Sequence, residues 1–119
     1  MKKVVFALLV ATICIQANAQ RAAQVAGQGW TPCGVYLEDR KTGDRVQSNY
    51  IAVWVRGYLS GYNTFATQPK LDTIPEIETV WTYLDRYCRD NPLDRIANGV
   101  DSLIASLGGY AAPYLINRK

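Results

Sequence analysis

The sequence predicts an all-α protein, a small bundle of about four helices with one disulfide. Three observations support this fold class. Apolar residues recur at three- and four-residue spacing in several segments, no segment shows sustained strand alternation, and two cysteines remain once an N-terminal leader is set aside. We therefore expect a single helical domain over residues 31–119, preceded by a flexible N-terminal segment over 20–30.

The leader over residues 1–19 has the pattern of a secretory signal peptide. Two lysines (residues 2–3) precede an apolar run over 4–15, and Ala-Asn-Ala at 17–19 has the small-x-small pattern of a cleavage site. An apolar helix over that run would be about 18 Å long, too short for a hydrocarbon core of roughly 30 Å, which argues against a membrane anchor. We expect a mature periplasmic protein that begins at Gln20 and is not stably inserted in the membrane.

Removal of this leader changes both the charge and the cysteine count. Of thirteen basic residues eleven remain, against ten acidic ones, and a net charge near +1 gives no reason to expect a nucleic-acid partner. Cys14 is lost, which leaves Cys33 and Cys88. An even pair of cysteines in an oxidising compartment predicts a disulfide. A redox-active pair is the weaker alternative, because the two cysteines lack C-x-x-C spacing.

The first two helices are predicted from capping residues and periodicity. Thr31 is the expected N-cap of the first helix, with Pro32 at its first position and its end near Gly43. The second helix is expected over about 48–66. Its apolar side carries Ile51, Trp54, Val55, Tyr58, Tyr62 and Phe65.

Two glycines, Gly57 and Gly61, flank the apolar side of the second helix. Each costs up to about 1 kcal/mol relative to alanine in a helix interior. We expect them to be helix-packing glycines that admit a neighbouring backbone. A small ligand notch beside the tyrosines is the alternative.

The last two helices have the clearest local signals. Thr73 and Glu76 have capping-box spacing and predict the start of the third helix. Asn91 and Pro92 end it and start the fourth, which stops at the glycine pair 108–109. The third helix buries Ile77, Val80, Trp81, Leu84 and Cys88. The fourth buries Leu93, Ile96, Val100, Leu103, Ile104 and Leu107. Since Cys33 begins the first helix and Cys88 lies on the apolar face of the third, the two can meet inside the bundle.

The residue types argue against catalysis. The chain has no histidine, which excludes Ser-His and Cys-His nucleophile systems and histidine metal sites. Glu78 and Asp85 lie roughly 10 Å apart along a helix, near the spacing of an inverting glycosidase, but on its polar face, where charges are usually solvated. We therefore expect no catalytic residue, no bound metal and no cofactor.

Three stretches carry a resemblance to known proteins. They are Trp-Val-Arg-Gly-Tyr-Leu-Ser-Gly-Tyr-Asn at 54–63, Trp-Thr-Tyr-Leu-Asp-Arg-Tyr-Cys at 81–88, and Asn-Pro-Leu at 91–93. Together they resemble the small periplasmic proteins of the HdeA/HdeB acid-stress group. The Rap1a/Tai immunity proteins have a similar layout. The resemblance covers about residues 31–107.

The resemblance implies a function without catalysis. The HdeA/HdeB group implies a chaperone with one disulfide that is a homodimer at neutral pH, loosens in acid and keeps unfolded clients soluble. The immunity group implies an inhibitor that binds a secreted cell-wall hydrolase, although its members commonly carry more than two cysteines. An accessory component of an envelope assembly is a third alternative. Client-binding residues cannot be carried over to this chain. Protonation of all ten carboxylates would take the mature chain from a charge near +1 to about +11, which permits an acid response.

Overall fold

A computed structural model describes residues 25–67 and 69–110. Its elements are a short 3₁₀ helix, η1 (Gly27–Trp30), and four α-helices: α1 (Cys33–Thr42), α2 (Arg45–Phe65), α3 (Ile77–Asp90) and α4 (Ile96–Ser106). These residues contain no β-strand, and a single antiparallel bridge pairs Pro32 with Arg95. The all-α prediction is confirmed. The predicted signal peptide and Gln20 lie outside the described residues.

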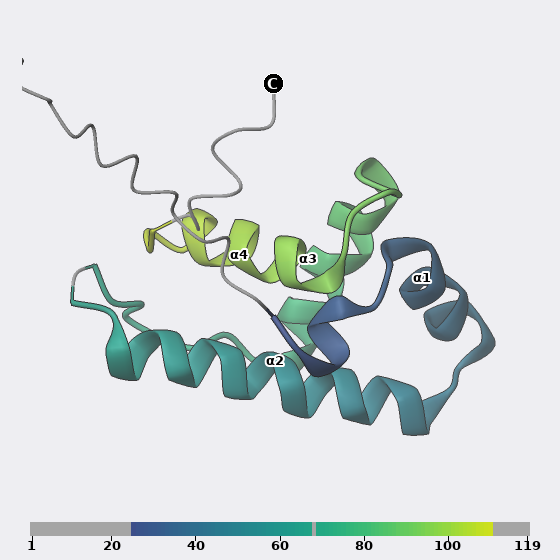
Figure 1. Cartoon of the computed structure of the whole chain (residues 1–119), viewed down its shortest axis with the longest axis horizontal. Coiled ribbons are helices and arrows are strands. Elements are labelled where there is room, and N and C mark those ends of the chain that lie inside the picture. Colours follow the sequence, from purple (N-terminus) through teal and green to yellow (C-terminus); the bar gives the residue numbers. More distant parts are fainter. Residues whose placement is uncertain (1–24, 68, 111–119) are drawn as a thin grey trace, which may run out of the picture.

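The long helix α2 forms one side of the molecule, and α1, α3, α4 and η1 lie on the same side of it (Figure 1). The core between them contains most of the residues predicted from periodicity. Its fully buried side chains are Cys33, Tyr36, Ile51, Val55, Leu59, Val80, Leu84, Cys88, Ile96, Val100 and Ile104. No helix within the described ranges is long and apolar enough to cross a membrane.

The start of each of the first two helices differs from the prediction. Helix α1 begins at Cys33 with Pro32 as its N-cap, because the hydroxyl of Thr31 bonds the side chain of Gln28 instead of capping the helix. Helix α1 ends as predicted, with Gly43 in the left-handed conformation at φ 73°. Helix α2 begins at Arg45, earlier than expected, because the carboxylate of Asp44 accepts the backbone N–H of Gln47 at 3.0 Å.

The predicted capping box of the third helix is wrong. Helix α3 begins at Ile77, and Glu76 is its N-cap without a side-chain hydrogen bond. The preceding loop is held by Asn63, whose side-chain oxygen accepts the Leu71 N–H at 2.8 Å while its amide donates to the Leu71 carbonyl at 3.1 Å. A contact between a helix and a distant loop therefore replaces the local cap.

Some residues assigned to apolar faces lie outside the core. Phe65 is 84% exposed and Leu93 is 97% exposed, and Leu107 is also exposed. Phe65 is the last residue of α2, Leu93 lies in the turn before α4 begins, and Leu107 follows the end of α4. Each of the three residues therefore lies at or just beyond an end of its helix, where the periodic pattern no longer predicts burial.

The end of the predicted flexible segment 20–30 is ordered as η1. The indole N–H of Trp54 donates to the carbonyl of Ala26 at 2.9 Å, and Gly29 is buried against the same ring. A Cβ on Gly29 would lie 2.2 Å from that indole. The prediction of a flexible segment is therefore wrong for residues 27–30.

The prediction that Gly57 and Gly61 are helix-packing glycines is also wrong for the described residues. A Cβ added to either glycine would meet no atom within 4 Å. Close contact instead requires glycine at Gly29, at Gly99 beneath Leu84 and Tyr87, and at Gly109.

Candidate functional site

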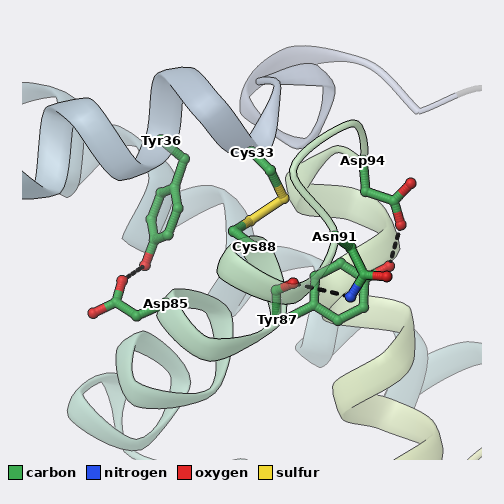
Figure 2. Close-up of a disulfide and its surroundings, with 7 residues drawn as sticks. All are labelled: Cys33, Tyr36, Asp85, Tyr87, Cys88, Asn91 and Asp94. Atoms are coloured by element: carbon green, nitrogen blue, oxygen red, sulfur yellow. Dashed lines mark hydrogen bonds between the residues drawn. A yellow bond between two sulfur atoms is a disulfide. The ribbon is translucent and has the colours of Figure 1, made fainter.

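The predicted disulfide joins Cys33 at the start of α1 to Cys88 near the end of α3 (Figure 2). Both cysteines are fully buried, and their sulfurs are 2.07 Å apart. Two backbone hydrogen bonds tie the same end of α1 to the turn before α4. The Cys33 N–H donates to the backbone carbonyl of Asp94 at 2.8 Å, and the Ile96 N–H donates to the backbone carbonyl of Thr31 at 3.0 Å. This end of the bundle is therefore held both covalently and by hydrogen bonds.

A second contact between α1 and α3 centres on Asp85. Its carboxylate accepts the Tyr36 hydroxyl at 2.6 Å and the guanidinium of Arg40 at 3.2 and 3.3 Å. Tyr36 is fully buried and stacks on Trp81, and the Arg40 guanidinium lies 5.1 Å from the centre of the same indole. Asp85 was expected on a solvated face, so this is a correction: Asp85 joins two helices.

The electrostatics of this cluster follow from its geometry. Burial, reinforced by the Asp85 carboxylate, raises the pKa of Tyr36 well above its ordinary value. The hydrogen bond to Asp85 raises the pKa of Arg40 as well. The tyrosine hydroxyl and the guanidinium therefore both keep their protons and serve as donors to the carboxylate.

A second tyrosine–carboxylate pair joins α2 to α4. The Tyr58 hydroxyl donates to Asp101 at 2.7 Å, and the Tyr58 ring stacks on Trp54 with 5.0 Å between ring centres. Asp101 is only 3% exposed. Burial raises the pKa of Asp101 to about 6, while the Tyr58 hydrogen bond acts in the opposite direction. Asp101 therefore takes up a proton under milder acid than an ordinary aspartate.

The third pair joins the end of α3 to the turn that follows it. The Tyr87 hydroxyl donates to the buried carboxylate of Asp94, and Figure 2 shows this bond beside the disulfide. The side chain of Asn91 donates to the Tyr87 carbonyl at 3.0 Å, which satisfies a carbonyl at the end of α3. Tyr36, Tyr58 and Tyr87 thus each bond an aspartate across a boundary between elements.

None of the three tyrosine–aspartate pairs is predicted by the sequence patterns, although the composition contains a signal. The chain has eight tyrosines but only two phenylalanines. Buried tyrosine hydroxyls need hydrogen-bond partners, and in a chain without histidine the aspartates are natural acceptors. The signal does not say which tyrosine meets which aspartate, because Tyr36 and Asp85 are 49 residues apart.

The two carboxylates considered as a catalytic pair, Glu78 and Asp85, have different surroundings on α3. Asp85 is bonded to Tyr36 and Arg40, while Glu78 is exposed on the same helix. Residues 25–67 and 69–110 contain no group of three or more acidic or cysteine side chains that could hold a metal ion.

The chain was compared with protein-family models, with curated proteins and with solved structures, and none of them matches it. The resemblance to the HdeA/HdeB group and to the Rap1a/Tai group therefore stays a prediction.

Proposed function

We propose that this protein is a non-enzymatic periplasmic protein with an acid-stress, chaperone-like function, in which acid loosens α1 from α3. The observation that carries the proposal is the position of Asp85. A single carboxylate accepts three hydrogen bonds from α1, and they hold Tyr36 in place over Trp81.

The strength of this contact depends on the negative charge of Asp85. Hydrogen bonds to charged groups contribute about 1.5–3 kcal/mol, against about 1 kcal/mol for neutral pairs, and a neutral carboxyl no longer attracts Arg40 as an ion. The disulfide would keep α1 attached at Cys33 while the rest of the helix moves away. The rings of Tyr36 and Trp81 would then become available to an unfolded client.

Asp101, at the contact between α2 and α4, is expected to respond to acid differently from the contact between α1 and α3. Its pKa is raised in the folded protein, so its protonation favours the folded state as the pH falls. Because burial outweighs the Tyr58 hydrogen bond in this shift, protonation of Asp101 does not by itself destabilise the folded state. A state in which α1 has moved away from α3 would keep helices but expose apolar surface.

The deciding experiment is light scattering of an acid-labile client during acidification to pH 2–3 and neutralisation. The purified, oxidised protein should suppress scattering at a near-stoichiometric ratio. An inert protein of similar net charge is the control. If the two proteins give the same scattering, the chaperone-like function is refuted.

A matched pair of variants tests the role of Asp85. Asp85→Asn removes the charge that accepts the hydrogen bonds of Tyr36 and Arg40, so binding of a hydrophobic dye should begin at a higher pH than in the unmodified protein. Asp90→Asn changes an exposed aspartate on the same helix and should leave the onset unchanged. Equal shifts in both variants would show that overall charge, and not Asp85, sets the response.

A further inference from the structure

The exposed side of α2 carries few charges: Arg45 and Arg56 are the only charged residues among its exposed positions. In the part of the chain that the structure describes, the other helices all lie on the opposite side of α2 (Figure 1). Some of the residues on this side recur at three- and four-residue spacing, and we call them the outer stripe of α2: Val46, Tyr50, Val53, Gly57, Gly61 and Thr64. All of them are exposed except Gly61, which is half-buried, and the exposed residues Asn49, Arg56 and Ser60 lie beside the stripe. A helix on a protein surface normally places charged residues on this face.

The first half of the outer stripe exposes large apolar side chains. Val46 is 64% exposed, Tyr50 59% and Val53 73%. They follow one another along two turns of a single helix and therefore form one continuous patch. Isolated exposed apolar residues are ordinary, whereas a contiguous apolar patch is characteristic of an interaction surface.

The second half of the outer stripe contains two glycines that the fold does not require. A Cβ on Gly57 or Gly61 would meet nothing within 4 Å, and neither glycine has a positive φ. Glycine weakens a helix relative to alanine and is used where another backbone must come close. No described element approaches Gly57 or Gly61, so within the described residues this side of α2 is open to a further backbone.

The charges beside the outer stripe indicate the chemistry of a partner molecule. Arg45 and Arg56 are the only charged residues among the 21 of α2. They are eleven residues apart, which places them on the same flank of the helix about 16 Å apart. Neither makes an ion pair with another described residue. A partner suited to this face would offer carboxylates, which a second copy of α2 cannot offer because it has none.

We propose that the outer stripe of α2 docks an α-helix of another protein, one with small and apolar side chains on its contacting face and carboxylates opposite Arg45 and Arg56. The glycines let the two helices approach closely, Tyr50 and Val53 supply apolar area, and the arginines fix the orientation of the partner. This surface is exposed in the folded protein, so the proposal does not depend on the response to acid.

The test uses two synthetic helical peptides and the full, oxidised protein at pH 7. One peptide has alanine and leucine along one stripe and two glutamates eleven residues apart on its flank, and its twin has lysines in place of the glutamates. Fluorescence anisotropy should show saturable binding of the glutamate peptide below about 1 mM, at least tenfold tighter than binding of the lysine peptide. Absence of binding, or equal binding of both peptides, would overturn the proposal.

Three variants locate the binding surface. Gly57→Leu should weaken binding at least tenfold without lowering the melting temperature, since a Cβ at this position meets no atom within 4 Å and leucine favours the helix. Gly34→Leu is the matched control, because Gly34 is an equally open helical glycine on α1, and its binding should be unchanged. Arg56→Glu should reverse the preference between the two peptides.

Sedimentation equilibrium tests whether a second copy of this chain, and not another protein, covers the outer stripe. The protein should be a monomer at the peptide-binding concentrations. A dimer that Gly57→Leu converts to a monomer would show that a second copy of this chain covers the outer stripe, and that result would overturn the proposed partner.

Discussion

Asp101 shows how a single buried carboxylate can couple stability to pH in this molecule. Its pKa rises from an ordinary value near 3.8 to about 6 in the folded protein, chiefly because burial disfavours the charged form. The folded state therefore binds the proton more tightly than the unfolded chain. The resulting stabilisation is complete below about pH 4 and is lost as the pH rises through about 6.

Asp101→Asn tests this coupling. The amide keeps an acceptor for the Tyr58 hydroxyl but does not titrate, so the variant should gain stability relative to the unmodified protein as the pH rises. We expect the difference in unfolding free energy to shift by up to about 2 kcal/mol in favour of the variant between pH 4 and pH 7.5. Urea unfolding at several pH values measures the shift, and a difference that does not change with pH would contradict it.

Sequence patterns predicted the core residues better than the polar contacts of single residues. Ile51, Val80 and Leu84 are buried as their periodicity predicts, because a core position needs only an apolar side chain on the inward face. Asp85 was misplaced because its environment depends on Tyr36 and Arg40, which belong to a helix more than forty residues away. Helical periodicity holds no information about such partners.

At the scale of elements, η1 and α2 are held together by the contact between Gly29 and Trp54. The Trp54 indole is fixed on one side by its hydrogen bond to Ala26 and on the other by its stack on Tyr58. It therefore has little freedom to move away from an added methyl group. Any residue larger than glycine at position 29 would therefore force the side chains around Trp54 to repack.

Two alanine substitutions of glycine should therefore have opposite effects. Gly29→Ala should lower the unfolding free energy by about 1–3 kcal/mol, because its Cβ overlaps the indole. Gly57→Ala should raise it by up to about 1 kcal/mol, because the methyl group meets no atom and alanine favours the helix. Thermal unfolding followed by circular dichroism gives both values. A destabilised Gly57→Ala variant would show that the open space beside α2 is not present in solution.

Helix ends were predictable only where the signal is local. The end of α1 at Gly43 follows from the left-handed conformation that glycine adopts readily, and the end of α3 follows from Asn91 and Pro92. The start of α3 was misplaced because Asn63 holds the preceding loop in a conformation that Thr73 alone would not impose. Tertiary contacts of this kind override a local capping pattern.

At the scale of the whole molecule, the disulfide links positions separated by 55 residues. Closing a loop of this length lowers the entropy of the unfolded chain and should stabilise the fold by roughly 4 kcal/mol in the chain-entropy model. Since a domain of this size has a total stability of only about 5–15 kcal/mol, the bond is a large fraction of the whole.

Reduction of the disulfide should therefore shift the unfolding transition to much lower urea. We expect a loss of about 2–4 kcal/mol when oxidised and reduced proteins are compared at neutral pH, and the same loss for Cys33→Ala combined with Cys88→Ala. Intact-mass analysis after alkylation without reductant should show no modified thiol on Cys33 or Cys88. An alkylated pair, or equal urea midpoints, would contradict the structural role of this bond.

The same bond determines how the molecule would carry a mechanical load. Tension applied at residues 25 and 110 would pass from η1 through the sulfur atoms directly to the end of α3 and on to α4. Helix α2 and most of α1 and α3 lie within the loop that the disulfide closes, so the covalent path of the force bypasses them. Reducing the bond under tension would release about 190 Å of additional chain, so the redox state of two sulfur atoms sets how far the domain can be stretched.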